Sequence, residues 1–260
     1  MNSTLTFTLI QSDLHWEDRP ANLRMFEEKL SSINERKEIV VLPEMFNTGF
    51  SMSPSTLYEE MDGTTVQWMK AMSSKHKVIL TGSVIIRESE AYYNRLIWMQ
   101  PNGEFGTYDK RHLFSLGGED KEFSGGDRKF IAQVKGWKIS TQICYDLRFP
   151  VWNRQSKAHD YDVLVYVANW PDKRVHAWKT LLQARAIENQ CFVVAVNRVG
   201  SDGNGFSYSG ESCIVSPMGK VLYSKANEED IFTITLDKNE ILEARSQFPF
   251  LADADEFVIL

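Results

Sequence analysis

Short apolar runs alternate with amphipathic helical stretches along this 260-residue chain. Residues 39–42 and 162–167 are rich in Ile, Val and Leu, as is typical of strands that are covered on both faces. Residues 176–190 instead place Trp178, Leu182 and Ala186 on one stripe at helical spacing. Because such strands and helices follow one another with short connections, we expect an α/β fold with helices on an outer face of the sheet.

The same periodicities predict the remaining elements. The expected strands cover residues 4–11, 39–42, 77–86, 94–99, 137–143, 162–167, 191–197, 213–216, 220–224 and 231–236. The expected helices cover residues 22–37, 63–75, 150–158 and 176–190, with a short helix after the last strand. No repeat, low-complexity linker or shift in composition divides the chain, so one domain over residues 1–260 is predicted.

Composition excludes several classes of partner. The formal net charge is −6, and no basic cluster alternates with aromatic residues, so nucleic acid is not an expected partner. The longest apolar runs, such as residues 163–168, are too short to span a bilayer. The first residues lack both the basic and the apolar segment of a secretion signal. We therefore expect no membrane partner either.

The cysteines and histidines indicate the compartment and argue against a metal. The chain has three widely spaced cysteines and no CxxC pair, which argues against a disulfide framework and predicts a reducing, cytoplasmic location. The five histidines show no HxxxH or HExxH spacing, so no metal site is expected. Cys191 and Cys213 lie inside apolar runs and are expected in the core.

Cys144 stands where a predicted strand turns toward a predicted helix. Residues Trp137–Ile143 alternate with the period of a strand, and Pro150 is tolerated early in the helix expected over residues 150–158. A thiol at such a corner projects from the sheet edge, near backbone N–H groups that lack intrahelical partners. That is the setting of a nucleophile. A small buried hydrophobe is the alternative, and the corner alone leaves both interpretations open.

Other strand ends carry further reactive groups. Glu44 and the pair Asn169–Trp170 follow predicted strands, and Lys110 lies just beyond another. In layered α/β folds ligands gather at the carboxyl ends of strands, where Cys144 also lies. These residues are therefore candidates for one site.

A thiol that attacks an amide needs a base, a cation or N–H pair for the oxyanion, and an acid for the leaving ammonia. Glu44 could act as base and then acid, because Met45, Phe46 and Phe50 would raise its affinity for a proton. Lys110 could hold the charge on the oxygen. Each also has a simpler explanation, since a glutamate after proline can begin a loop and a Lys-Arg-His run is usually a solvated turn.

Three ordered motifs resemble the nitrilase (carbon–nitrogen hydrolase) superfamily, whose members use a Glu–Lys–Cys triad in that chain order. The motifs are Pro-Glu at residues 43–44, Asp-Lys-Arg-His-Leu-Phe at 109–114 and Ile-Cys-Tyr-Asp-Leu-Arg-Phe-Pro at 143–150. The resemblance extends through residues 166–171, 183–190 and 197–204. Within the superfamily the chain looks most like the bacterial omega-amidase branch.

The resemblance implies a four-layer α-β-β-α sandwich as a single domain. It also implies a homodimer in which the sandwiches continue across the interface, with no metal or organic cofactor. Carried onto this sequence, Glu44 is the general base, Lys110 the oxyanion cation and Cys144 the nucleophile. The backbone N–H of Tyr145 would be the second oxyanion donor.

Superfamily members often add a second glutamate after the lysine, which orients the substrate and the catalytic groups. Glu119 is the preferred candidate and Glu122 its rival, because the length of the loop is not determined by any pattern in the sequence.

By analogy the substrate is the terminal amide of a short 2-oxo acid, such as 2-oxoglutaramate, which is cleaved to 2-oxoglutarate and ammonia through a Cys thioester. Its far carboxylate needs a cation, for which Arg174 is a candidate, while structural ion pairs explain Arg148 and Arg185 equally well. Phe114 and Trp170 would form walls of the pocket, although core packing explains them nearly as well.

Three rival interpretations stay open. The same fold could act on a nitrile or an N-carbamoyl amine, or transfer an acyl group. A cysteine–histidine hydrolase could use His112 or His176 as base, although both are expected to be structural histidines. An inert binding protein could keep the fold without the chemistry.

Overall fold

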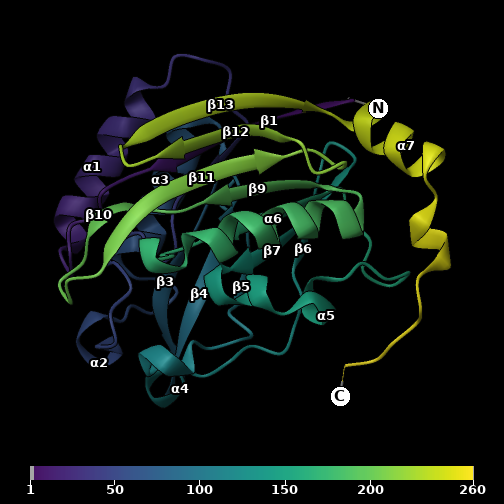
Figure 1. Ribbon diagram of the computed structural model, residues 1–260. Coiled ribbons are helices and arrows are strands. Elements are labelled where there is room, and N and C mark those ends of the chain that lie inside the picture. The colour runs from purple at the N-terminus through teal and green to yellow at the C-terminus, as the bar shows by residue number, and fades with distance from the viewer. Residues whose placement is uncertain (1–2, 260) are drawn as a thin grey trace.

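Two β-sheets pack face to face, and helices cover their outer faces (Figure 1). The computed structural model describes residues 3–259, so the extreme ends of the predicted 1–260 domain lie outside it. This arrangement confirms the predicted α-β-β-α sandwich. No helix within the described part of the chain is long and apolar enough to cross a membrane.

The first sheet has the strand order β13-β1-β2-β3-β4-β5. The strand β2 pairs in parallel with β1 and β3, and the outer pairings are antiparallel. Its strands are β1 (Thr4–Gln11), β2 (Ile39–Val41), β3 (Ile79–Glu88), β4 (Ala91–Met99), β5 (Phe105–Asp109) and β13 (Asp230–Asp237).

The second sheet has the order β10-β11-β9-β8-β7-β6, with β12 paired to the other side of β11. Its central strands β7, β8 and β9 are parallel. Its strands are β6 (Ile131–Val134), β7 (Trp137–Ile143), β8 (Val163–Val167), β9 (Phe192–Val196), β10 (Val199–Ser201), β11 (Ser207–Val215) and β12 (Val221–Ala226). The hairpin predicted over residues 213–224 is confirmed as the β11–β12 pair.

Helices α1 and α3 cover the first sheet, and α6 covers the second. In α1 the residues Leu23, Phe26 and Leu30 recur at helical spacing and are buried, and the Asp18 side chain caps the helix by accepting the N–H of Ala21. The helices are α1 (Arg19–Ser32), α2 (Pro54–Leu57), α3 (Thr64–His76), α4 (Glu119–Glu122), α5 (Pro150–Asn153), α6 (Val175–Asn189) and α7 (Lys238–Gln247).

The apolar run at β2 shows why the layers form. Ile39 and Val41 belong to the core cluster that joins the two sheets, whereas Val40 and Leu42 belong to the cluster beneath α1 and α3. Alternate residues of a strand point to opposite faces, so a continuous apolar run needs a cover on both sides. The prediction of a doubly covered strand is confirmed.

The helix predicted over residues 150–158 is wrong in length, because α5 ends at Asn153. The Asn153 side chain donates to the carbonyl oxygens of Asp146 and Phe149, 2.7 Å from each, and Arg154 is already extended. The Gln155 N–H then binds the side-chain oxygen of a residue on α6. Side-chain capture of the backbone therefore ends the helix after four residues.

Candidate active site

The carboxyl ends of three strands bring Glu44, Lys110 and Cys144 together. Glu44 follows β2, Lys110 follows β5 and Cys144 follows β7. The Nζ of Lys110 lies 2.9 Å from Oε1 of Glu44 and 2.8 Å from Oε2 of Glu119. All four side chains are buried, whereas Glu122 on the same short helix as Glu119 is exposed. Of the two candidate glutamates, Glu119 is therefore the one that lies in the cluster.

Both carboxylate oxygens of Glu44 have fixed partners. Oε1 accepts from Lys110 and from Nδ2 of Asn94, at 2.8 Å, and Oε2 accepts the backbone N–H of Asn169, also at 2.8 Å. The side chain of Asn169 in turn donates to the carbonyl oxygen of Glu44 at 2.6 Å. The carboxylate is thus held in one orientation between two strand ends.

Burial and charge determine which groups of the cluster are ionised. Burial, followed by the charge of Glu44, raises the pKa of the Cys144 thiol well above its usual range, against the opposite effect of Lys110. Burial by itself lowers the pKa of Lys110, but the carboxylates of Glu119 and Glu44 raise it overall. Burial also raises the pKa of Glu119 despite its contact with Lys110. The resting cluster therefore holds a neutral thiol beside a charged ammonium.

Cys144 occupies a tight turn rather than the start of a long helix. Its φ is +42°, in the left-handed region that is rare for residues other than glycine, and it begins the 3₁₀ turn Cys144–Arg148. The Asp146 side chain stabilises this turn by accepting the N–H of Ile143 at 3.0 Å. The N–H of Tyr145 lies in the first part of the turn, where backbone donors have no acceptor within the turn.

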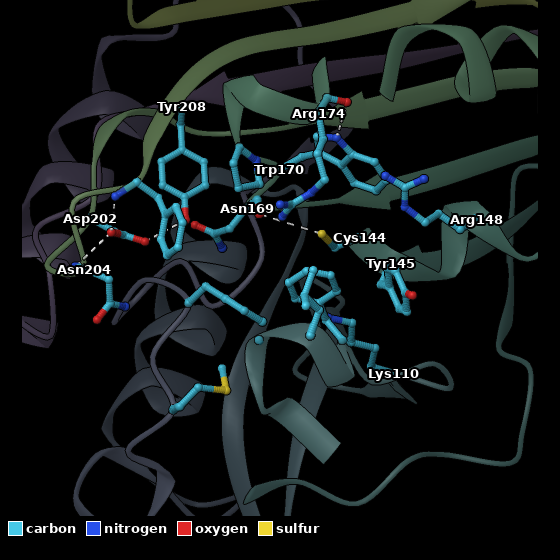
Figure 2. A pocket seen from close by; sticks show the side chains of 17 residues that line it. Lys110, Cys144, Tyr145, Arg148, Asn169, Trp170, Arg174, Asp202, Asn204 and Tyr208 are labelled. Atoms are coloured by element: carbon cyan, nitrogen blue, oxygen red, sulfur yellow. Dashed lines mark hydrogen bonds between the residues drawn. The ribbon is translucent and has the colours of Figure 1, made fainter. Parts of the chain in front are cut away.

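Cys144 and Lys110 line a cavity of about 210 Å³ (Figure 2). The thiol Sγ lies 3.9 Å from the carbonyl oxygen of Asn169. The figure shows Asp202, Asn204 and Tyr208 grouped away from Cys144 and Tyr145. The other lining residues are Phe50, Met52, Phe114, Leu116, Gly117, Arg148, Trp170, Pro171, Arg174 and Phe206. The wall of the cavity is thus mainly apolar, and its charged residues are Lys110, Arg148, Arg174 and Asp202.

Two of the three candidate arginines reach this cavity. The guanidinium of Arg174 lies 4.9 Å from the ring centroid of Phe114, and that of Arg148 lies 4.8 Å from the ring of Trp170. Arg185 is instead buried elsewhere, where it donates to the Leu147 carbonyl oxygen and pairs with a glutamate on its own helix. The structure therefore brings Arg174 and Arg148 to the site and gives Arg185 a structural role.

The histidines and the other cysteines lie apart from the cavity. His112 Nδ1 is 2.8 Å from a carboxylate oxygen of Asp146, and its ring stacks on Phe149. His176 is exposed on α6, and Cys191 and Cys213 are buried in the core of the second sheet. None of these four candidates lines the cavity within the described residues.

Sequence reasoning missed three polar residues of the site, namely Asn94, Asp202 and Tyr208. Asn94 was expected only as the start of a strand, yet it shares the apolar face of β4 with Leu96, and that exception in the alternation was its signal. Asp202 accepts the N–H groups of the loop at 204 and 206, and the hydroxyl of Tyr208 at 2.8 Å. A glycine-rich turn hides such contacts in the sequence.

Comparisons with known proteins show the family to which the chain belongs. A sequence model of the carbon–nitrogen hydrolase family matches residues 7–246. The chain is 42% identical over 254 residues to the omega-amidase YafV of Escherichia coli (strain K12), covering 97% of this chain and 98% of that protein. It is 35% identical to the 2-oxoglutaramate amidase of Bacillus subtilis (strain 168), covering 95% of this chain and 96% of that protein.

A solved structure is similar in fold and in sequence. XC1258 from Xanthomonas campestris, described as a CN-hydrolase superfamily protein with an arsenic adduct in the active site, superimposes with a TM-score of 0.95. The two are 39% identical, and the match covers 99% of each chain. The chain is therefore an enzyme that belongs to the carbon–nitrogen hydrolase family.

Proposed function

We propose that this enzyme hydrolyses the terminal amide of a small 2-oxo acid, such as 2-oxoglutaramate, to the 2-oxo diacid and ammonia through a thioester on Cys144. The observation that carries the proposal is the buried cluster of Glu44, Lys110 and Glu119 beside a thiol at a cavity. The similarity to an omega-amidase and a 2-oxoglutaramate amidase supports the substrate class.

Acylation begins with the neutral thiol. Glu44 takes the proton as the sulfur of Cys144 adds to the amide carbon, and the carbonyl electron pair moves to the oxygen. The ammonium of Lys110 and the N–H of Tyr145 stabilise this oxyanion. Glu44 then returns the proton to the nitrogen, the carbon–nitrogen bond breaks, and ammonia leaves a thioester.

Deacylation reuses the same groups. Glu44 takes a proton from water as the oxygen adds to the thioester carbon, and Lys110 again faces the oxyanion. The intermediate collapses with cleavage of the carbon–sulfur bond, and the thiolate regains its proton from Glu44. The acid leaves, and the enzyme returns to its starting state.

Glu119 fits the role of the orienting carboxylate. Its two oxygens accept from Lys110, and one of them also accepts the N–H of Phe114 at 2.6 Å. It therefore connects the oxyanion cation to an aromatic wall of the cavity. Replacing it would disturb both at once.

Arg174 is the proposed partner of the far carboxylate of the substrate, with Arg148 as a second cation on the same cavity. Phe114 and Trp170 form walls beneath these guanidinium groups. The homodimer and the cytoplasmic location stay predictions; the latter is supported by three unpaired thiols in the described chain.

Ammonia release across a panel of substrates tests the proposal. The panel compares 2-oxoglutaramate with glutamine, a nitrile and an N-carbamoyl amine, and Cys144→Ala is the inactive control. We expect the highest kcat/KM for the 2-oxo amide. Preference for the nitrile or the carbamoyl compound would favour that alternative, and no turnover with an unreactive Cys144 would favour an inert binding protein.

A further inference from the structure

Asn94 contacts every charged member of the catalytic cluster. It lies on β4 with its side chain completely buried. Its Nδ2 donates to Oε1 of Glu44 at 2.8 Å and to Oε1 of Glu119 at 3.2 Å. Its backbone carbonyl oxygen accepts the backbone N–H of Lys110 at 3.0 Å. One residue thus connects the base, the orienting carboxylate and the backbone that carries the oxyanion cation.

The orientation of this amide follows from its surroundings. Both hydrogen bonds of Nδ2 go to carboxylates, and Oδ1 has no hydrogen-bond partner among residues 3–259. A buried polar atom without a partner is destabilising. Turning the amide over would be worse, because Oδ1 would then face two carboxylate oxygens. The amide donor is therefore the part of Asn94 that serves the cluster.

The contacts of Glu44 show what this donor does. Asn94 and Lys110 both hold Oε1, whereas Oε2 binds the N–H of Asn169. The carbonyl oxygen of the same Asn169 lies 3.9 Å from Sγ of Cys144. Oε1 therefore accepts two hydrogen bonds, whereas Oε2 accepts one within the described residues and keeps capacity to accept the thiol proton.

We propose that Asn94 is a positioning residue that holds Oε1 of Glu44, so that Oε2 stays aimed at the thiol proton. This inference rests on the proposed function, because it assumes that Glu44 is the base for Cys144. The same amide also separates two carboxylates that share one ammonium, which limits their mutual repulsion. The titratable groups that face it are Glu44, Glu119 and Lys110, with Cys144 beyond them.

The test compares Asn94→Ala and Asn94→Asp with a matched control, Leu96→Val. Leu96 lies two residues along the same strand, on the same face, and is equally buried in the core cluster that joins the sheets. The readout is the rate at which iodoacetamide alkylates Cys144 across a range of pH, followed by peptide mass spectrometry. This reaction does not depend on the identity of the natural substrate.

We expect Asn94→Ala to lower the alkylation rate near neutral pH about tenfold to hundredfold, as a misaligned base does. The acid limb of the pH profile should move to higher pH, because a hydrogen bond that favours the charged carboxylate is lost. Asn94→Asp should react more slowly still, since it fills the same space but adds a negative charge. Leu96→Val should follow the wild type.

The order of the alkylation rates of the two Asn94 variants shows whether Asn94 acts as a hydrogen-bond donor or only fills volume. If Asn94 only fills volume, Asn94→Asp will react faster than Asn94→Ala, and neither will shift the acid limb; that result overturns the inference. A shift in Leu96→Val as large as in Asn94→Ala overturns it too. If Asn94→Asp does not fold, Asn94→Leu replaces it as the variant of similar volume without a donor, and wild-type reactivity there is equally contradictory.

Failure of the proposed function gives a different pattern. If Cys144 of the wild type does not react with iodoacetamide, the thiol–carboxylate mechanism itself is contradicted. The same holds if Cys144 reacts but the pH profiles of the wild type and of Glu44→Gln both lack an acid limb. A reactive wild-type thiol with unchanged Asn94 variants contradicts only the role of Asn94. Thermal unfolding of each variant confirms that the compared proteins are folded.

Discussion

The ammonium nitrogen of Lys110 lies 2.9 Å from Oε1 of Glu44, with both side chains almost completely buried and 66 residues apart in the chain. The pair forms because β2 and β5 end at the same edge of one sheet. Removing one partner of such a pair leaves an uncompensated buried charge. Loss of one partner therefore destabilises the fold by more than formation of the pair stabilises it.

Lys110→Met should therefore lower the free energy of unfolding by about 3–5 kcal/mol near neutral pH. Burial already raises the pKa of Glu119, and loss of the ammonium removes the opposing effect. The folded variant then binds more protons than the unfolded chain, so its free energy of unfolding rises as the pH falls. The difference in free energy of unfolding between the variant and the wild type therefore becomes smaller at low pH. Urea unfolding over a pH series measures this. Lys121→Met, an exposed lysine on α4, is the control, and a gap that does not change with pH would contradict the prediction.

Glu44→Gln should lower kcat/KM by about 10²–10⁴, the usual contribution of a positioned acid–base group. His176→Gln should leave kcat/KM unchanged, because His176 is exposed and does not line the cavity. Steady-state ammonia release compares the two. If Glu44→Gln keeps its activity and His176→Gln loses activity, the cysteine–histidine mechanism would be favoured.

Arg174→Met should raise KM for a 2-oxo acid amide about tenfold to a hundredfold, since a hydrogen bond to a charged group contributes about 1.5–3 kcal/mol. KM for a neutral aliphatic amide should stay the same. Arg148→Met tests the second cation in the same way. Arg185→Met is the structural comparison, expected to lower the unfolding temperature without a selective effect on KM. Equal changes for charged and neutral substrates would exclude a carboxylate-binding role for Arg174.

Asp146→Asn should loosen the turn that carries Cys144. The Asp146 carboxylate accepts from the hydroxyl of Tyr108 at 2.7 Å, from the backbone N–H and the ring Nδ1 of His112, and from the N–H of Ile143. An amide cannot accept at both positions, so buried donors are left without partners, at about 1–3 kcal/mol each. The unfolding temperature and kcat should both fall. Asp120→Asn, at an exposed site, should change neither.

The strand ends that carry Glu44, Cys144 and Asn169 were predictable, unlike the end of β5 before Lys110. Residues 39–42 and 162–167 are apolar runs typical of buried strands, and residues 137–143 alternate with the period of a strand. The choice between Glu119 and Glu122 was not predictable. A 3₁₀ turn at Ser115–Gly117 and a φ of +79° at Gly118 decide which carboxylate turns inward, and no periodicity encodes that. The short helix after Cys144 has a similar cause, because side-chain hydrogen bonds of Asp146 and its neighbours override the helical pattern.

Three further short strands, β5, β6 and β10, also escaped the sequence. The strands β5, β6 and β10 span three to five residues each and carry glycine or polar positions. Such segments gain their order from neighbouring strands, such as β4 for β5, rather than from their own propensity. Asn94 was overlooked for a related reason: only the register of β4 against β5 places it opposite the lysine-bearing segment.

Rapid-quench mass spectrometry of the Cys144 peptide during turnover of 2-oxoglutaramate tests whether Cys144 carries a covalent intermediate. We expect a thioester between Cys144 and the former amide carbon of the substrate, which forms as ammonia is released and decays as the acid appears, with neither product formed by Cys144→Ala. Turnover with an unmodified thiol, or ammonia release that persists in Cys144→Ala, would contradict it.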